Sequence, residues 1–221
     1  MEDAHLRRAL LLLRHARPAE AEKELRAQLE VVPDDTQALL LLSHALSEQD
    51  KHKEAVAIAR EAVAAAPDLD SAHYHLARAL FGQRDLAEAR RSAEEAVTLD
   101  PGDADNHGLL ALILHHASAH EEALAAAERG LAIDPEHLGC LNVRSAELTH
   151  LKRHEEADST IGKALELDPE NPYTHSNTGW TALRRGDQAR AMEHFREALR
   201  REPGLESARA VAVGLGVYGL Q

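Results

Sequence analysis

Residues 191–203 read Ala191-Met-Glu-His-Phe195-Arg-Glu-Ala198-Leu199-Arg-Arg-Glu202-Pro203. Alanine and leucine recur at helical spacing between charged residues, which predicts an amphipathic helix. The stretch closes on a proline, which cannot continue a helix interior. The same arrangement returns every 34 residues toward the N-terminus without an insertion, and it predicts a chain of repeated helical units. Its prolines are Pro33, Pro67, Pro101, Pro135, Pro169 and Pro203.

Two columns of small residues keep the same period. The first stands twelve residues before each proline, and its members are Ala21, Ala55, Ala89, Ala123, Ala157 and Ala191. The second stands twelve residues earlier still, and its members are Ala9, Ser43, Ala77, Ala111, Ser145 and Gly179. Small side chains at both positions indicate that two helices of each unit approach closely. A leucine three residues after the second column, as at Leu46 and Leu80, is expected to fill the space between the helices.

This pattern resembles the tetratricopeptide repeat, with a small residue early, alanine in the middle, an apolar or aromatic residue four later and proline near the end. The resemblance implies an all-α protein, an α-α superhelix of six helix–turn–helix units, each with a second helix that ends at the proline. The array is expected to span residues 1–205, and the composition, rich in good helix formers, agrees with it. The predicted repeats are about 2–35, 36–69, 70–103, 104–137, 138–171 and 172–205.

Histidine replaces the aromatic residue that the family places in two packing columns. In the first helices it stands at positions 5, 73, 107 and 175, and in the second helices at positions 52, 120 and 154. We expect these side chains to fill space between helices while half-buried.

Beyond Leu205 a further helix is predicted over residues 206–213, followed by an apolar tail that ends at Gln221. Terminal repeats of a solenoid usually carry a polar cap. Three alternatives stay open for residues 206–221: an imperfect cap, a contact with a second copy, or the start of a membrane segment. Some bacterial proteins of this family do continue into hydrophobic helices.

The formal charge of −13 disfavours contact with nucleic acid, because an acidic surface repels phosphates. Residues 172–221 are the exception, with seven arginines against five acids, but the acids are interleaved at helical spacing.

The single cysteine, Cys140, fits a reducing compartment. The N-terminus lacks the pattern of a signal peptide, so the sequence predicts a cytoplasmic protein.

In the superhelix that the resemblance implies, the first helices line the inner wall, where ligands bind. Four of the six aromatic residues, Tyr74, Phe81, Tyr173 and Trp180, fall on positions expected there. Trp180 has an alternative role, in which it packs on Leu205 or Ala208 and seals the end. The predicted groove consists of His44, Tyr74, Arg78, Phe81, Leu112, His116, Asn142, His150, Tyr173, Asn177, Trp180 and Arg184.

No constellation for catalysis or cofactor binding is recognisable. The sequence lacks a glycine-rich phosphate loop and a nucleophile elbow, so we expect no enzymatic activity and no cofactor. His115, His116, His120 and His150 lack a cysteine or acidic partner at ligand spacing, so no metal site is predicted. The sequence therefore predicts a scaffold that binds a peptide or a partner helix. The alternatives are a self-assembling module and the cytoplasmic region of a membrane-attached protein.

Overall fold

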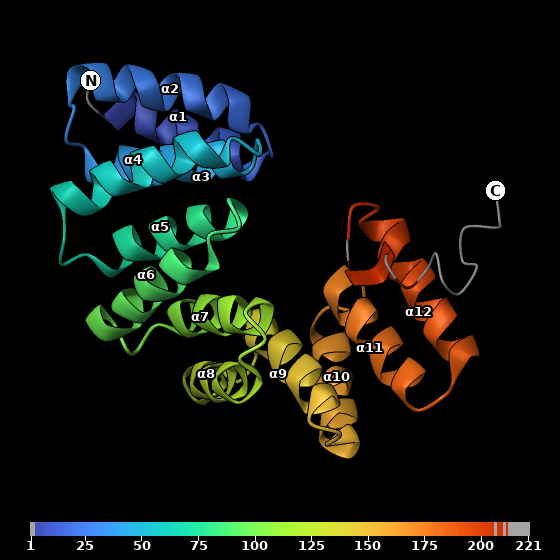
Figure 1. Ribbon diagram of the computed structural model, residues 1–221. Coiled ribbons are helices and arrows are strands. Elements are labelled where there is room, and N and C mark those ends of the chain that lie inside the picture. The colour runs from blue at the N-terminus through green and yellow to red at the C-terminus, as the bar shows by residue number, and fades with distance from the viewer. Residues whose placement is uncertain (1–2, 206, 210, 212–221) are drawn as a thin grey trace. The chain divides into compact units, whose positions relative to one another are not determined.

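The computed structural model describes residues 3–205, 207–209 and 211. Over residues 3–205 it forms twelve α-helices joined by short turns (Figure 1). The first helices of the repeats are α1 (Asp3–Arg14), α3 (Thr36–Ser47), α5 (Asp70–Gly82), α7 (Ala104–His116), α9 (Leu138–His150) and α11 (Pro172–Arg184). The second helices are α2 (Pro18–Val31), α4 (His52–Ala65), α6 (Leu86–Leu99), α8 (His120–Ile133), α10 (His154–Leu167) and α12 (Gln188–Arg201).

The helices form two compact units, Met1–Ala117 with α1–α7 and Ser118–Gln221 with α8–α12. In the first unit each helix packs on the next, and the first helices α1, α3, α5 and α7 also pack on one another in order (Figure 1). In the second unit consecutive helices again pack together, and α9 packs on α11. Within each unit the helices therefore stack pair upon pair.

The two columns of small residues form the closest contacts between helices. All six alanines that stand twelve residues before the prolines are 0% exposed. Ser43 of α3 donates a hydrogen bond of 3.1 Å from its hydroxyl to the carbonyl oxygen of Ala55 on α4, so the two columns meet. In the last repeat the ring of Phe195 lies where a Cβ on Gly179 would stand, at 2.8–2.9 Å. A larger residue in either column would overpack the pair.

The second helices end two residues before each proline, not at the proline as the sequence predicted. The reason is steric, because proline disfavours the helical conformation of the residue before it. That residue is extended in all six repeats, with φ between −141° and −123° and ψ between 76° and 100°. Two residues after the proline, the side chains of Asp35, Asp103, His137 and Asn171 cap the next helix.

The turn inside each repeat contains one residue in the left-handed region. These residues recur every 34 positions with φ between 52° and 84°, and only the last is a glycine: Ala16, Asp50, Arg84, Ser118, Lys152 and Gly186. A left-handed residue is the usual way to end a helix. Non-glycine residues adopt it at a cost of about 1–2 kcal/mol, so five turns are strained relative to the sixth.

The C-terminal end of the described chain packs on the last repeat. Ser207–Arg209 and Val211 are helical, and Leu205 and Ala208 are buried against Ala182 and Phe195. This helical segment agrees with the predicted seventh helix as far as it is described. The apolar tail, residues 212–221, lies outside the described residues. Among the helices that are described, none is both long and apolar enough to cross a bilayer.

Candidate functional site

The twelve side chains predicted to line a groove lie on five first helices, and none of them is fully buried. Within the first unit, α3, α5 and α7 carry His44, Tyr74, Arg78, Phe81, Leu112 and His116. Within the second unit, α9 and α11 carry Asn142, His150, Tyr173, Asn177, Trp180 and Arg184. The two sets differ in their surroundings and are described separately.

A polar cluster joins α3 and α5 in the first unit. Arg78 of α5 donates to a carboxylate oxygen of Glu48, directly after α3, over 2.6 Å. The Nε2 atom of His44 lies 3.5 Å from the same oxygen. Half of the Glu48 side chain and a third of the Arg78 side chain remain exposed. The pair is therefore accessible to a ligand that carries a charged group.

His75 lies beside this cluster, and the sequence did not single it out. Its ring is 5.6 Å from the ring of Tyr74 in an edge-on contact and 6.2 Å from the ring of His44. Burial, together with the charges of Arg78 and His44, lowers the pKa of His75 from 6.5 to about 4. Burial and Arg78 also lower the pKa of His44, against the opposing effect of Glu48. Both rings are therefore neutral near pH 7.

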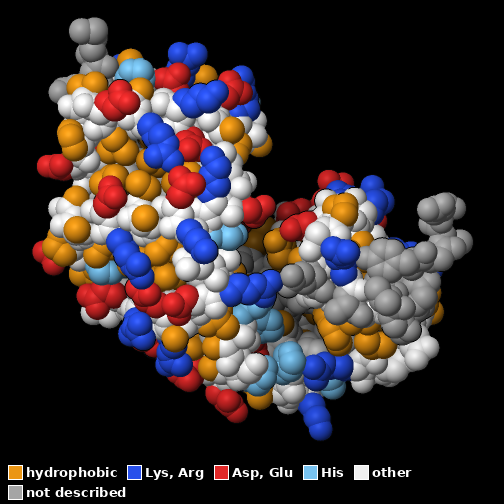
Figure 2. Space-filling model, turned by 45° about the horizontal axis from the view of Figure 1, so that its top comes forward, with side chains coloured by type: hydrophobic (Ala, Val, Ile, Leu, Met, Phe, Trp, Pro, Cys, Tyr) orange, Lys and Arg blue, Asp and Glu red, His pale blue; other side chains and the backbone are white. Residues whose placement is uncertain are grey.

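An aromatic contact joins α5 and α7 in the same unit. The rings of Phe81 and His116 lie 4.9 Å apart at 70°, an edge-to-face geometry. Phe81 is half-buried and His116 is exposed, so one side of the pair faces solvent. Over the N-terminal helices, the face drawn in Figure 2 shows acidic and basic side chains interspersed rather than segregated. On α3, α5 and α7 themselves, the ring pair of Phe81 and His116 and the ion pair of Arg78 and Glu48 are both partly exposed.

In the second unit, the predicted amides hold helices together. Asn177 of α11 donates to the backbone oxygen of Asn142 on α9 over 2.9 Å and to the hydroxyl of Ser145 over 3.2 Å. Thr174 donates to the side-chain oxygen of Asn142 over 2.8 Å. One helical turn after Ser145 and Asn177, the hydroxyls of Thr149 and Thr181 lie 2.8 Å apart. The hydrogen bonds of these side chains therefore join α9 to α11.

A second cluster of the same unit surrounds Glu147, whose side chain is fully buried on α9. His120, at the start of α8, lies 2.7 Å from its carboxylate through Nδ1. The ring of His150 stacks on His120 at 4.5 Å, and Arg184 lies 3.2 Å from Nδ1 of His150. Because Arg184 can only donate, Nδ1 of His150 is the acceptor in this contact. The cluster ties α8, α9 and α11 together.

Trp180 packs at the end of the described array. Its indole N–H donates to the backbone oxygen of Ser207 over 3.2 Å, and its ring meets Phe195 edge-on at 5.9 Å. It also borders the buried cluster that contains Leu205 and Ala208. These contacts correspond to the capping role considered for Trp180. Tyr173 remains 49% exposed and is the most open aromatic side chain of α11.

Several histidines in the aromatic columns fill space between helices and also close turns. Their Nε2 atoms lie 2.8–3.1 Å from the backbone oxygen of the proline six residues earlier, in the pairs His73–Pro67, His107–Pro101 and His175–Pro169. His107 is 4% exposed. The fixed spacing of six residues between proline and histidine is a sequence signal that could have predicted this bond.

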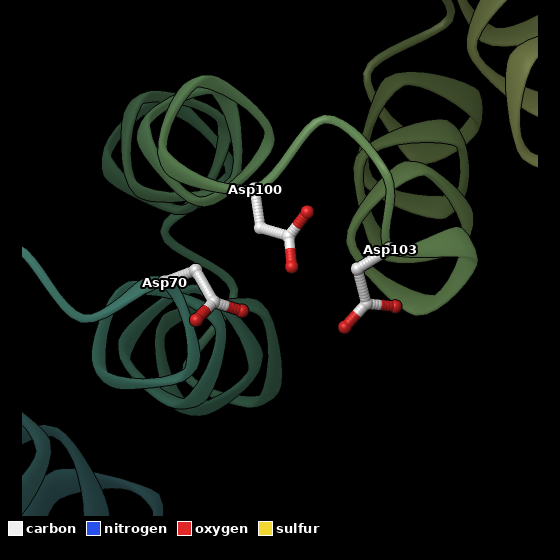
Figure 3. A group of neighbouring side chains, drawn as sticks. All are labelled: Asp70, Asp100 and Asp103. Atoms are coloured by element: carbon white, nitrogen blue, oxygen red, sulfur yellow. The ribbon is translucent and has the colours of Figure 1, made fainter.

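Three aspartates form the one group among the described residues with the geometry to approach a metal ion. Asp70, Asp100 and Asp103 place carboxylate oxygens within 4.8 Å of one another at the ends of α5, α6 and α7 (Figure 3). Carboxylate oxygens suit a hard cation such as Ca²⁺. Each carboxylate already accepts a bond within the fold, from Asn106 to Asp70, from Gly102 to Asp100 and from Asp105 to Asp103. Turn and cap geometry accounts for the cluster.

The comparison with protein families decides the assignment. A model described as the tetratricopeptide repeat matches residues 6–70, 74–137 and 151–206. The chain belongs to the tetratricopeptide repeat family. The members of this family are non-catalytic protein-interaction scaffolds, and a protein partner in general is therefore supported. None of the curated proteins matches the sequence.

Solved tetratricopeptide proteins have the same fold at low sequence identity. A chain of the APC/C hetero-tetramer Cut9–Hcn1 matches with a TM-score of 0.85 and 14% identity, over 97% of this chain and 43% of that one. PilF of Pseudomonas aeruginosa matches with a TM-score of 0.75 and 19% identity, over 96% and 97% of the two chains. YrrB, described as having an unusual peptide-binding site, matches with a TM-score of 0.58 and 18% identity, over 86% and 97%.

Proposed function

We propose that this tetratricopeptide protein binds a peptide or a partner helix on the exposed face of α3, α5 and α7. The observation that carries the proposal is the combination on this face of an open aromatic pair, Phe81 with His116, and an open ion pair, Arg78 with Glu48. Aromatic and arginine side chains dominate the binding energy of protein interfaces when a partner covers them. The peptide-binding site named in the description of YrrB supports the same kind of ligand.

The chemistry of the face defines the partner. An apolar side chain of the ligand packs on Phe81 and His116, and a basic side chain reaches Glu48, whose carboxylate is half exposed. The chain carries a formal charge of −13, and this field accelerates the approach of a basic partner. We therefore propose a ligand of mixed apolar and basic character. A peptide-display selection can identify such a ligand.

A peptide-display selection against the full chain tests the proposal. The dissociation constant of an enriched peptide is then measured for the wild type and for Phe81→Ala and Glu48→Gln. Loss of a central aromatic anchor is expected to weaken binding by about 2 kcal/mol, roughly thirtyfold. Glu88→Gln is the matched control, because Glu88 makes a similar inter-helix ion pair with Arg60 on the second helices. Equal weakening by all three variants would reject this face as the site.

One observation favours self-association as a second candidate function. Leu11 of α1 is 56% exposed, whereas the residues of the same repeat position, Ala45, Ala79 and Ile113, are 0% exposed. The first repeat has no described helix over this position, so a second copy could cover it. Light scattering of the wild type and of Leu11→Ser tests this candidate. A mass independent of concentration in both would exclude it.

We propose a reducing compartment, the cytoplasm, because the sequence contains a single cysteine, Cys140, which is buried and can form no disulfide within the chain. Attachment to a membrane would depend on residues 212–221, which lie outside the described part of the chain.

A further inference from the structure

The second unit contains an open cavity of about 350 Å³ that the proposed peptide-binding face does not use. It lies between the second helices α8 and α10, with α9 at its base. One wall is apolar and consists of Leu131, Ala132, Pro135 and Leu141. The volume falls in the usual range of small-molecule sites, about 300–1,000 Å³.

The cavity coincides with a break in the repeat pattern. Arg144 occupies a position of α9 that is leucine in the second, third and fourth repeats and threonine in the sixth, whereas the first repeat also has an arginine, Arg8. Its equivalents Leu42, Leu76, Leu110 and Thr178 are 0%, 7%, 8% and 3% exposed. The Arg144 side chain is 24% exposed instead. An arginine therefore stands at a position where three other repeats bury a leucine.

The guanidinium of Arg144 is incompletely paired. Its Nη1 donates to the hydroxyl of Thr160. The nearest carboxylates, Glu128 at 3.7 Å and Glu156 at 3.9 Å, are beyond hydrogen-bond distance. Glu156 already forms a bidentate ion pair with Arg153, with hydrogen bonds of 2.7 and 2.8 Å. Several of the five N–H donors of Arg144 thus point to no acceptor among the described residues.

A second cation and a hydroxyl complete the polar side of the cavity. Lys163 and Ser159 of α10 line it together with Arg144. Within the described part of the chain, Lys163 makes no ion pair. The cavity therefore has two cations against the single carboxylate of Glu128, in a chain that is acidic as a whole. A local excess of positive charge beside an apolar wall suits an anion that carries an apolar group.

We propose that this cavity binds a carboxylate attached to a short apolar group. The planar guanidinium of Arg144 can donate two parallel hydrogen bonds to the oxygens of a carboxylate, and Lys163 adds a third charged donor. The apolar group packs on Leu131 and Pro135. Two sources supply this chemistry: a free branched-chain acid, and the C-terminus of a peptide that ends in an apolar residue.

Isothermal titration calorimetry with the full chain tests the proposal. The probes are 4-methylpentanoate, a hexapeptide that ends in leucine with a free carboxylate, and the neutral amide of each. At least one carboxylate is expected to bind at millimolar concentration or below, and both amides are expected to bind at least about tenfold more weakly. Binding of the free acid identifies a small-molecule site, and binding of the peptide alone identifies a partner's C-terminus.

Arg144→Leu is the decisive variant, because it restores the residue of three other repeats and should fold at least as well as the wild type. Carboxylate binding should fall by about tenfold or more in Arg144→Leu and by a smaller factor in Lys163→Gln. Arg196→Gln, on the exposed side of α12, is the control and should bind normally. No saturable binding of either carboxylate, equal binding of the amides, or full binding by Arg144→Leu would each overturn the proposal.

Discussion

The exposed face of α3, α5 and α7 and the contact between α9 and α11 use the same repeat positions for different purposes. Tyr74 and Asn142 occupy equivalent positions, as do Arg78 and Trp180. In the first unit these positions carry Tyr74, whose ring is partly exposed, and Arg78, which forms an accessible ion pair with Glu48. In the second unit they carry an amide and an indole whose polar groups are bonded to neighbouring helices.

The comparison shows that repeat position alone does not determine function. A position on a first helix is available to a ligand only when its side chain is not needed to hold the next repeat. The second unit contains a buried carboxylate, Glu147, and a chain of Asn and Thr bonds, and these require partners inside the fold. We therefore expect mutations in the second unit to reduce stability and mutations in the first unit to reduce binding.

Trp180→Ala should produce the largest loss of stability. It removes a large ring from the cluster around Phe195 and the bond to Ser207, and the unfolding free energy should fall by about 2–3 kcal/mol. Phe81→Ala, on the open face of the first unit, should cost about 1 kcal/mol or less. Urea unfolding measures both. A loss in Phe81→Ala that equals the loss in Trp180→Ala would remove the distinction between the two regions.

Acid should weaken the first unit through His75. The pKa of His75 is about 4 in the folded chain and 6.5 without the fold, so its contribution is complete above pH 6.5 and is lost as pH falls toward 4. The unfolding free energy should drop by about 2 kcal/mol from this residue between about pH 7.5 and pH 5. His75→Phe should remove that part of the pH dependence. An unchanged pH profile in His75→Phe would show that the ring is solvated.

Asn177→Ala should destabilise by about 1–2 kcal/mol, because it removes two hydrogen bonds between α11 and α9. Arg78→Ala breaks a partly exposed ion pair and should change the unfolding free energy by less than about 1 kcal/mol. Thermal unfolding of the two variants under identical conditions compares them. If Arg78→Ala were the more damaging change, its pair with Glu48 would be structural and not available to a ligand.

The turns should give the smallest effects. Gly186→Ala in the second unit places a Cβ at φ +84° and should cost about 1 kcal/mol. Ala16→Gly in the first unit relieves a left-handed alanine at φ +52° but raises the conformational entropy of the unfolded chain. The unfolding free energy should therefore rise by only about 0.5 kcal/mol or less. Opposite signs for the two substitutions would confirm the strain that the periodic turns imply. A clear loss in Ala16→Gly would refute it.

Much of the fold could be predicted from the sequence, because its columns repeat six times in one register. The positions of the close contacts, the helix pairs and the family follow from Pro33 and its equivalents and from the alanine column. The turn residues could not be predicted in the same way. Arg84 and Lys152 have no preference for the left-handed conformation, which the adjacent helices impose on them.

The candidate site was less predictable than the fold. The spacing placed all twelve side chains on first helices, but it could not show which of them other helices would engage. The bonds of Asn142 depend on Thr174 and Asn177 in the following repeat, and the contacts of Trp180 depend on Ser207. Such partners lie 27–35 residues away and differ from repeat to repeat, so a periodic pattern does not contain them. The groove itself stays a prediction.

The most direct test of the central claim is an NMR titration of the isotope-labelled full chain with a peptide obtained by selection. The account predicts that the largest shifts of amide signals fall on α3, α5 and α7, near Glu48, Arg78 and Phe81, and that the signals of α9 and α11 around Asn142 and Asn177 change little. Large shifts confined to α9 and α11, with the first unit unaffected, would contradict it.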